Sequence, residues 1–168
     1  MRPSRSLGLP RYRIAPVWFV FRLLVVAAIN GTCPVSPLQN VLPELVGPAR
    51  GLGPWLVDGS DGRWSSRDTP NKTLWILRTT RERTTIRGHE MSSGATTRFQ
   101  SGGPDSPITD AMVVDDPWRD SVIPGGATWE LKNQYLFLPS YVYYPVAGCY
   151  QFDVAIGDRH EPITIEIK

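Results

Sequence analysis

The two histidines, His89 and His160, are the side chains in this sequence best suited to act as general bases or to bind a transition metal. Neither has a cysteine, aspartate or glutamate at the spacing that metal sites use. The chain contains no G-x-S-x-G, H-E-x-x-H, G-x-G-x-x-G or P-loop motif. We therefore expect no catalytic residue, no metal and no cofactor. A secreted hydrolase that uses His89 or His160 is kept as an alternative hypothesis.

Aspartates could supply the oxygen ligands that calcium prefers. Asp58 and Asp61 lie in "VDGSDG", which lacks both the full D-x-D-x-D-G series and the bidentate glutamate of a calcium loop. We interpret this stretch as a pair of Asp-Gly turns. We interpret the second group as part of a solvated loop, and its members are Asp105, Asp110, Asp115, Asp116 and Asp120.

The aromatic residues are the best candidates for a binding site, because the chain holds six tryptophans and six tyrosines. Exposed aromatic rings can stack on sugars or anchor a protein partner. We expect Trp75 to belong to the core. Four others lie in or beside the polar stretch 101–130, and we predict that they bind the ligand: Trp118, Trp129, Tyr141 and Tyr143. The alternative is that they have only a structural role, packing in the core or holding the loop in place.

The chain has two cysteines, Cys33 and Cys149, and three interpretations are open. They form a disulfide in an oxidising compartment, which is the interpretation we favour. In the second interpretation Cys33 is lipidated, although the preceding "AAINGT" departs from the usual bacterial lipidation box. In the third interpretation both are inert thiols.

The N-terminal leader predicts export. Residues 1–13 are arginine-rich, and the apolar run "IAPVWFVFRLLVVAA" follows over residues 14–28. This order is typical of a secretory signal peptide, here residues 1–28, with small residues at the expected cleavage position near Ala28. Pro16 and Arg22 interrupt the run, which is also shorter than the ~20 residues of a membrane span. An uncleaved anchor is the alternative.

The net charge of +2 belongs to this leader. Residues 1–28 contain five arginines and no acid, so 13 basic residues remain against 16 acidic ones, a formal charge of −3. This balance does not favour a nucleic-acid partner for the folded part.

The rest of the chain predicts short β-strands. Residues 29–54 contain many prolines and glycines and are expected to form an extended arm before a domain at 55–168. Strands are predicted at these ranges by their β-branched, aromatic and alternating residues: 55–57, from Trp64, 74–80, 84–90, 135–138, 141–144, 150–156 and 163–167. Residues 92–129 are polar and rich in turn residues, and we expect them to be irregular.

No segment shows a convincing amphipathic helical pattern, and turn residues separate the strands at regular spacing. About seven short strands of this kind predict an all-β fold, an immunoglobulin-like antiparallel β-sandwich.

Four pieces of the chain, in order, are "CPVS", "DGSDGRW", "LWILR…IRGHEMSSGA" and "PVAGCYQFDVAIGD". Together they resemble an uncharacterised family of secreted bacterial proteins and lipoproteins with an immunoglobulin-like domain. Members of that family show a Cys-Pro start, a Gly-Ser-Asp-Gly-x-Trp step and a Pro-x-x-Gly-Cys-Trp near the end. Here Tyr150 replaces the last tryptophan, and residues 91–94 replace a Leu-Asp-Gly-like step. The resemblance implies that Cys33 pairs with Cys149, and it implies no activity.

Taken together, the sequence predicts a non-enzymatic exported protein, secreted or held in the cell envelope, with a binding or structural role. An aromatic-platform carbohydrate-binding module is the first alternative. The expected partner is an unidentified extracellular protein or glycan. Membrane attachment would occur only through an uncleaved leader or a lipidated Cys33.

Overall fold

The computed structural model describes residues 32–42, 47–58, 67–103 and 105–168. The predicted signal peptide, Asp61 and the strand expected from Trp64 lie outside these residues. Within them the chain forms eleven strands and two short helices: β1 (Leu38–Leu42), β2 (Gly47–Arg50), β3 (Trp55–Asp58), β4 (Arg67–Arg78), β5 (Thr84–Glu90), β6 (Arg98–Gln100), β7 (Ile108–Thr109), β8 (Met112–Val114), α1 (Pro117–Asp120), the 3₁₀ helix η1 (Trp129–Asn133), β9 (Tyr135–Tyr144), β10 (Gly148–Ile156) and β11 (Arg159–Ile167).

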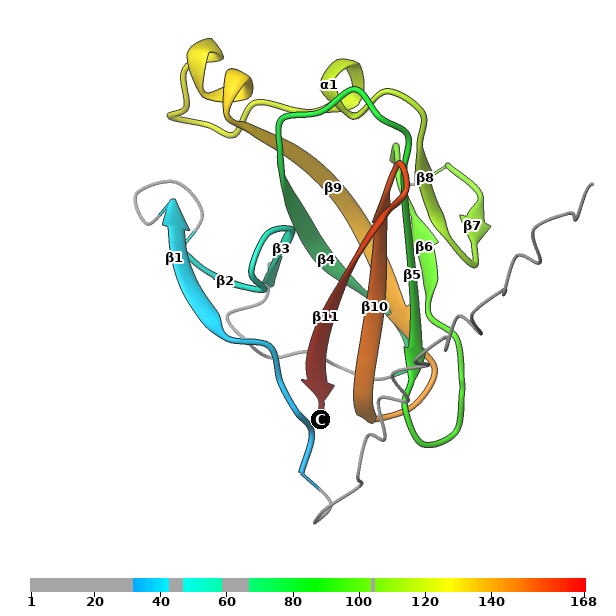
Figure 1. Cartoon of the computed structure of the whole chain (residues 1–168). Coiled ribbons are helices and arrows are strands. Elements are labelled where there is room, and N and C mark those ends of the chain that lie inside the picture. The colour runs from blue at the N-terminus through cyan, green and yellow to red at the C-terminus, as the bar shows by residue number, and fades with distance from the viewer. Residues whose placement is uncertain (1–31, 43–46, 59–66, 104) are drawn as a thin grey trace, which may run out of the picture. The chain divides into compact units, whose positions relative to one another are not determined.

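The strands form two antiparallel sheets that pack against each other (Figure 1). The seven-stranded sheet has the order β1-β2-β3-β4-β9-β6-β7, and the four-stranded sheet has the order β11-β10-β5-β8. The predicted all-β sandwich is therefore confirmed.

Seven of the strands have the order found in a constant-type immunoglobulin domain. The run β3-β4-β9-β6 corresponds to strands A-B-E-D, and β11-β10-β5 corresponds to G-F-C. The Tyr150 hydroxyl, at the start of β10, donates to the Val146 carbonyl at 2.7 Å, which is the hydrogen bond of a tyrosine corner. The described chain has more than the seven strands expected because β1, β2, β7 and β8 are short additions at the sheet edges.

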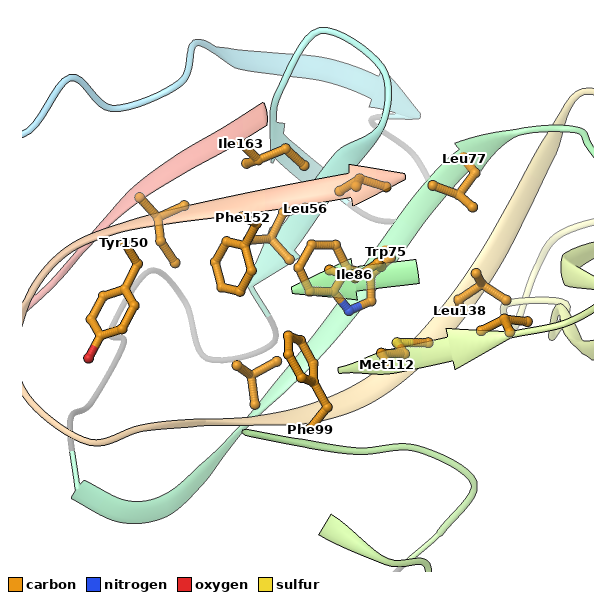
Figure 2. Close-up of a cluster of buried hydrophobic side chains, with 14 of the residues drawn as sticks. Leu56, Trp75, Leu77, Ile86, Phe99, Met112, Leu138, Tyr150, Phe152 and Ile163 are labelled. Carbon is orange, nitrogen blue, oxygen red and sulfur yellow. The ribbon is translucent and has the colours of Figure 1, made fainter. Parts of the chain in front are cut away.

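The main core lies between the two sheets (Figure 2). Side chains alternate along each strand, so Tyr150, Phe152 and Val154 of β10 all face inward. Trp75 of β4 is fully buried, packs edge-on against Phe152 with ring centroids 5.2 Å apart, and donates its indole N–H to the Ser140 hydroxyl at 2.9 Å. Trp75 is thus a core residue, as predicted.

A second apolar cluster covers the opposite face of the seven-stranded sheet. Ile76 and Phe137 lie on that face and are buried together with Trp55. The β1–β2 hairpin contributes Ala49, with Val41 and Leu42 packed against the cluster. In its described part, the segment predicted as an extended arm forms β1 and β2 and belongs to the same compact unit as the sandwich.

Two further differences from the expected elements concern β6 and β9. The polar stretch 92–129 contains three strands and α1, because β6 pairs with β9 and β8 pairs with β5. The two strands expected at 135–138 and 141–144 are one continuous strand, in which Pro139 pairs with Leu74 of β4. A proline is tolerated there because no described strand pairs with this part of β9 on the side away from β4, so no hydrogen bond between strands needs the missing N–H.

Candidate functional site

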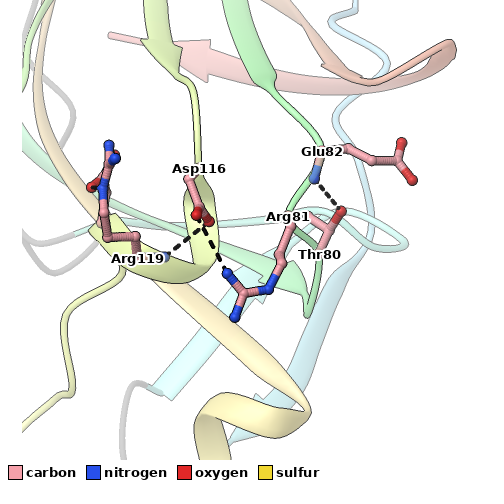
Figure 3. Close-up of polar contacts among 6 residues, drawn as sticks. Thr80, Arg81, Glu82, Asp116 and Arg119 are labelled. Atoms are coloured by element: carbon pink, nitrogen blue, oxygen red, sulfur yellow. Dashed lines mark hydrogen bonds and ion pairs between the residues drawn. The ribbon is translucent and has the colours of Figure 1, made fainter.

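Helix α1 is a single turn that holds Trp118 at one end of the sandwich. The Asp116 carboxylate caps it by accepting the Arg119 backbone N–H at 3.1 Å, and Pro117 occupies the first helical position. Figure 3 shows the same carboxylate facing Arg81, whose guanidinium donates to it at 3.4 Å. This cap ties α1 to the connection between β4 and β5.

Trp118 and Trp129 meet edge to face, with ring centroids 5.9 Å apart and an interplanar angle of 82°. The Arg81 guanidinium lies over the Trp118 ring at 4.3 Å. Trp118 is half-buried and packs against the main core, whereas Trp129 is 55% exposed. The Trp129 ring is therefore the part of this pair that a ligand can reach.

Lys132 contacts both indole rings. Its ammonium lies 4.7 Å from the Trp118 ring centroid and 4.9 Å from that of Trp129, and it donates to the Ser121 carbonyl at 3.2 Å. The residue is only 5% exposed, and within the part of the chain that the structure describes no carboxylate forms an ion pair with it. The indole faces and the carbonyl therefore stabilise this buried charge.

Backbone and hydroxyl contacts anchor the cluster to β9. The Ser121 hydroxyl accepts the Phe137 N–H at 2.8 Å, and Val122 donates its N–H to the Phe137 carbonyl at 2.9 Å. We name the set Trp118, Trp129, Lys132 and Arg81 the tryptophan–cation cluster. Its members come from the β4–β5 connection, α1 and η1, and β9 provides the support.

Charges of both signs surround this cluster. Arg119 and Asp120 form a two-pronged contact at 2.7 and 3.1 Å, and the hydrogen bond from Arg119 lowers the pKa of Asp120. Arg83 pairs with Asp115 at 3.3 Å. These paired groups offer hydrogen-bond donors and acceptors without a strong net field, which suits a neutral polar ligand better than a multivalent ion.

Tyr141 and Tyr143, the other two predicted binding residues, lie elsewhere. Both are half-buried on β9, and the Tyr143 hydroxyl donates to the Gln100 side-chain oxygen at 2.9 Å. Tyr143 is six residues beyond Phe137, which is about 20 Å along an extended strand. The structure thus brings Trp118 and Trp129 together and separates both from the tyrosines.

Lys132 and Arg81 were not predicted as part of a site. One signal for Lys132 exists, because side chains three residues apart eclipse in a 3₁₀ helix and Trp129 precedes Lys132 by three. That signal is readable only once η1 is known to be a 3₁₀ helix. The contact between Arg81 and Trp118 has no sequence signal, since 37 positions separate them.

The two histidines lie at different places on the four-stranded sheet and are exposed. His160 contacts the Asp153 carboxylate through Nδ1 at 2.9 Å. His89 lies on β5 opposite Gln151. No serine hydroxyl forms a hydrogen bond with either ring in the described parts of the chain. The same residues contain no group of three or more His, Cys, Asp or Glu side chains placed to hold a metal.

Cys33 and Cys149 form a disulfide, with Cα atoms 5.3 Å apart and 116 positions between them in sequence. A sulfur bonded to sulfur cannot also carry a thioether-linked lipid, so the disulfide form excludes lipidation at Cys33. The segment after Cys33 lies along β11, where Ser36 donates its N–H to the Thr164 carbonyl at 2.8 Å. Thr164 in turn donates its N–H to the Ser36 hydroxyl at 2.9 Å.

A buried carboxylate lies beside the disulfide. Glu90 accepts the backbone N–H groups of Ser92 and Ser93 at 3.0 and 2.6 Å, and both serine hydroxyls at 2.7 Å. These hydrogen bonds, that of the Ser92 hydroxyl first, lower the pKa of Glu90 from 4.5 to about 2. The ionised Glu90 thus orders the turn that follows β5.

No protein-family model and no curated protein matches this chain. One solved X-ray structure is similar, described as that of a "putative lipoprotein from Bacillus anthracis". It is 12% identical with a TM-score of 0.52, and the match covers 93% of this chain and 99% of that one. At this identity the similarity shows the fold alone. Within the described residues, no helix has the length and apolar character needed to cross a membrane.

Proposed function

We propose that this chain is an exported, non-enzymatic protein with a binding or structural role outside the cytoplasm. The Cys33–Cys149 disulfide carries the proposal, because disulfides of this kind persist in oxidising compartments. The arginine-rich leader with its apolar run supports export. The solved structure with the same fold is described as a "putative lipoprotein", which fits an extracytoplasmic location.

The test is to express the full chain with its own leader and to measure the intact mass of the exported protein. We expect a mass that matches cleavage near Ala28, and cysteines that react with an alkylating reagent only after reduction. Protein that stays in the cytoplasm with two freely reactive thiols would overturn the proposal. A mass that matches a chain beginning at Cys33 with added acyl chains would show that the protein is tethered to a membrane and lacks the disulfide.

Carbohydrate binding is the second candidate function, and the exposed ring of Trp129 favours it. A half-exposed indole flanked by paired charges offers a stacking face and hydrogen-bonding groups, which is the combination that sugar rings require. Lys132 contacts both rings, but Arg81 covers Trp118 alone and Trp129 is the more exposed of the two, so we assign the stacking role to Trp129.

Retention on insoluble polysaccharides tests this candidate. We expect Trp129→Ala to abolish retention and Ile108→Ala, which changes an exposed residue on β7, to leave it unchanged. Equal retention of both variants, or no retention of the unaltered protein, would refute carbohydrate binding. The hydrolase alternative requires ester or peptide turnover that is lost on changing His89 or His160.

A further inference from the structure

One edge of the seven-stranded sheet lacks a stretch of strand. β6 pairs with β9 as far as Gln100 opposite Tyr141, and Val122 forms an isolated bridge with Phe137. Between these two points, no strand of the described chain pairs with β9 on this side. Residues 138–140 therefore form an open segment of sheet edge.

A groove of about 290 Å³ lies at this open segment. Leu138 and Pro139 line it from β9, and Met112–Val114 line it from β8. Asp120 and Val122 lie at the side that continues from α1. The lining is mainly apolar, and Val113 and Val122 are 42% and 43% exposed.

The groove runs along the edge of β8 and not along one of its faces. Consecutive residues of a strand point to opposite faces, yet all three residues of β8 line the groove. β8 is also the last strand of its sheet and pairs only with β5 in that sheet. An edge of this kind can pair with the backbone of an added extended segment.

The chain segment that contains β8 is negatively charged. Residues 101–116 contain four aspartates and no lysine or arginine. Asp115 and Asp116 are paired with Arg83 and Arg81. Asp105 and Asp110 are exposed and form no ion pair within the described residues, so cationic groups are favoured near the chain that leads into β8.

We propose that β8 and this groove bind an extended segment of a partner protein, apolar at alternate positions and carrying lysine or arginine at its ends. The segment adds to the free edge of β8, its apolar side chains enter the groove beside Val113 and Val122, and its cationic end near the start of β8 faces the stretch that carries Asp105 and Asp110. This inference rests on the proposed binding role of the protein and names the chemistry of one partner.

The test uses a fluorescently labelled, end-blocked peptide, Lys-Val-Thr-Val-Thr-Val-Lys, and fluorescence anisotropy with the full exported chain. We expect saturable binding that weakens between about 50 and about 500 mM salt. Two control peptides should bind at least about fivefold more weakly. One replaces both lysines with glutamate, and the other replaces the central valine with proline, which removes a backbone donor.

Protein variants locate the site. The double variant Val113→Ser/Val122→Ser should weaken binding by about tenfold through lost apolar contact. Asp105→Asn/Asp110→Asn should weaken it by about two- to fivefold at low salt only. Ile108→Ser changes an equally exposed apolar residue on β7 and should bind like the unaltered protein. Unfolding curves establish that each variant is folded.

The proposal is overturned if no peptide binds, if the glutamate peptide binds as well as the lysine peptide, or if Val113→Ser/Val122→Ser binds unchanged. Failure of this peptide test leaves the export and disulfide measurements intact. Conversely, free thiols in a cytoplasmic protein would overturn the proposed function while a measured peptide affinity would stand.

Discussion

Gly88 and Glu90 lie two residues apart on β5, and the contacts around each define what can occupy the position. A Cβ built on Gly88 would lie 2.5 Å from the Phe152 ring and 2.8 Å from the Thr97 hydroxyl. Glu90 accepts hydrogen bonds from both serines of the following turn. Neither requirement is visible in the alternation that identifies β5 as a strand.

We predict that Gly88→Ala destabilises the fold by about 1–3 kcal/mol, because the added methyl group must displace the buried Phe152. Urea unfolding measures the change in the free energy of unfolding. Gly125→Ala is the control, since a Cβ there meets no atom within 4 Å. Equal stability of the two variants would contradict the prediction and show that the Phe152 ring can move aside without a measurable loss of stability.

We predict a loss of stability in acid that depends on Glu90. Its pKa in the folded state is about 2, below the ordinary value of 4.5. The unfolded chain therefore takes up the proton first, so the stabilisation is complete above pH 4.5 and disappears as the pH falls towards 2. Thermal unfolding between these values should show a smaller pH dependence for Glu90→Gln. Glu161→Gln, at an exposed position, should keep the full dependence.

At the scale of elements, α1 and η1 are too short to be stable alone and depend on their contacts with each other and with β9. Lys132 connects them, since its ammonium touches the rings of Trp118 in α1 and Trp129 in η1. The strands themselves follow from sequence far better than these helices. β5, β10 and β11 carry regular alternation, whereas Trp118 and Lys132 show no periodic pattern.

We predict that Lys132→Ala lowers the free energy of unfolding by about 1–3 kcal/mol, because it removes the buried methylene stem as well as the cation that contacts both indoles. Tryptophan fluorescence should also change, since the Trp118 and Trp129 rings both lose contact with the ammonium group. Lys168→Ala, which alters an exposed terminal lysine, is the control. An unchanged spectrum and stability would contradict the observed packing.

At the scale of the whole molecule, the disulfide joins the first described segment to the head of β10. It closes a loop of 116 positions, and in the chain-entropy model a loop of this size adds about 4–5 kcal/mol by restricting the unfolded chain. The β1–β2 hairpin adds stability from the same region by covering Ile76 and Phe137.

We predict that Cys33→Ser/Cys149→Ser lowers the free energy of unfolding by about 4 kcal/mol relative to the oxidised protein. Urea unfolding measures this change. Reductant should lower the stability of the unaltered protein to that of the double variant and leave the double variant unaffected. If reductant changes neither protein, the cysteines are not paired in solution.

The sequence by itself determined the class of fold, because period-two alternation and turn residues are local properties that survive without knowledge of the partner strands. It also placed Trp75 in the core. Only the tertiary structure decided that β6 and β8 arise within the polar stretch 92–129, since three-residue strands acquire their identity from pairing with β9 and β5. Tertiary structure likewise separated Trp118 and Trp129 from Tyr141 and Tyr143. Each residue of an extended strand advances the chain by about 3.3 Å, so the two tyrosines lie far along β9 from the end at which the segments carrying the two tryptophans meet.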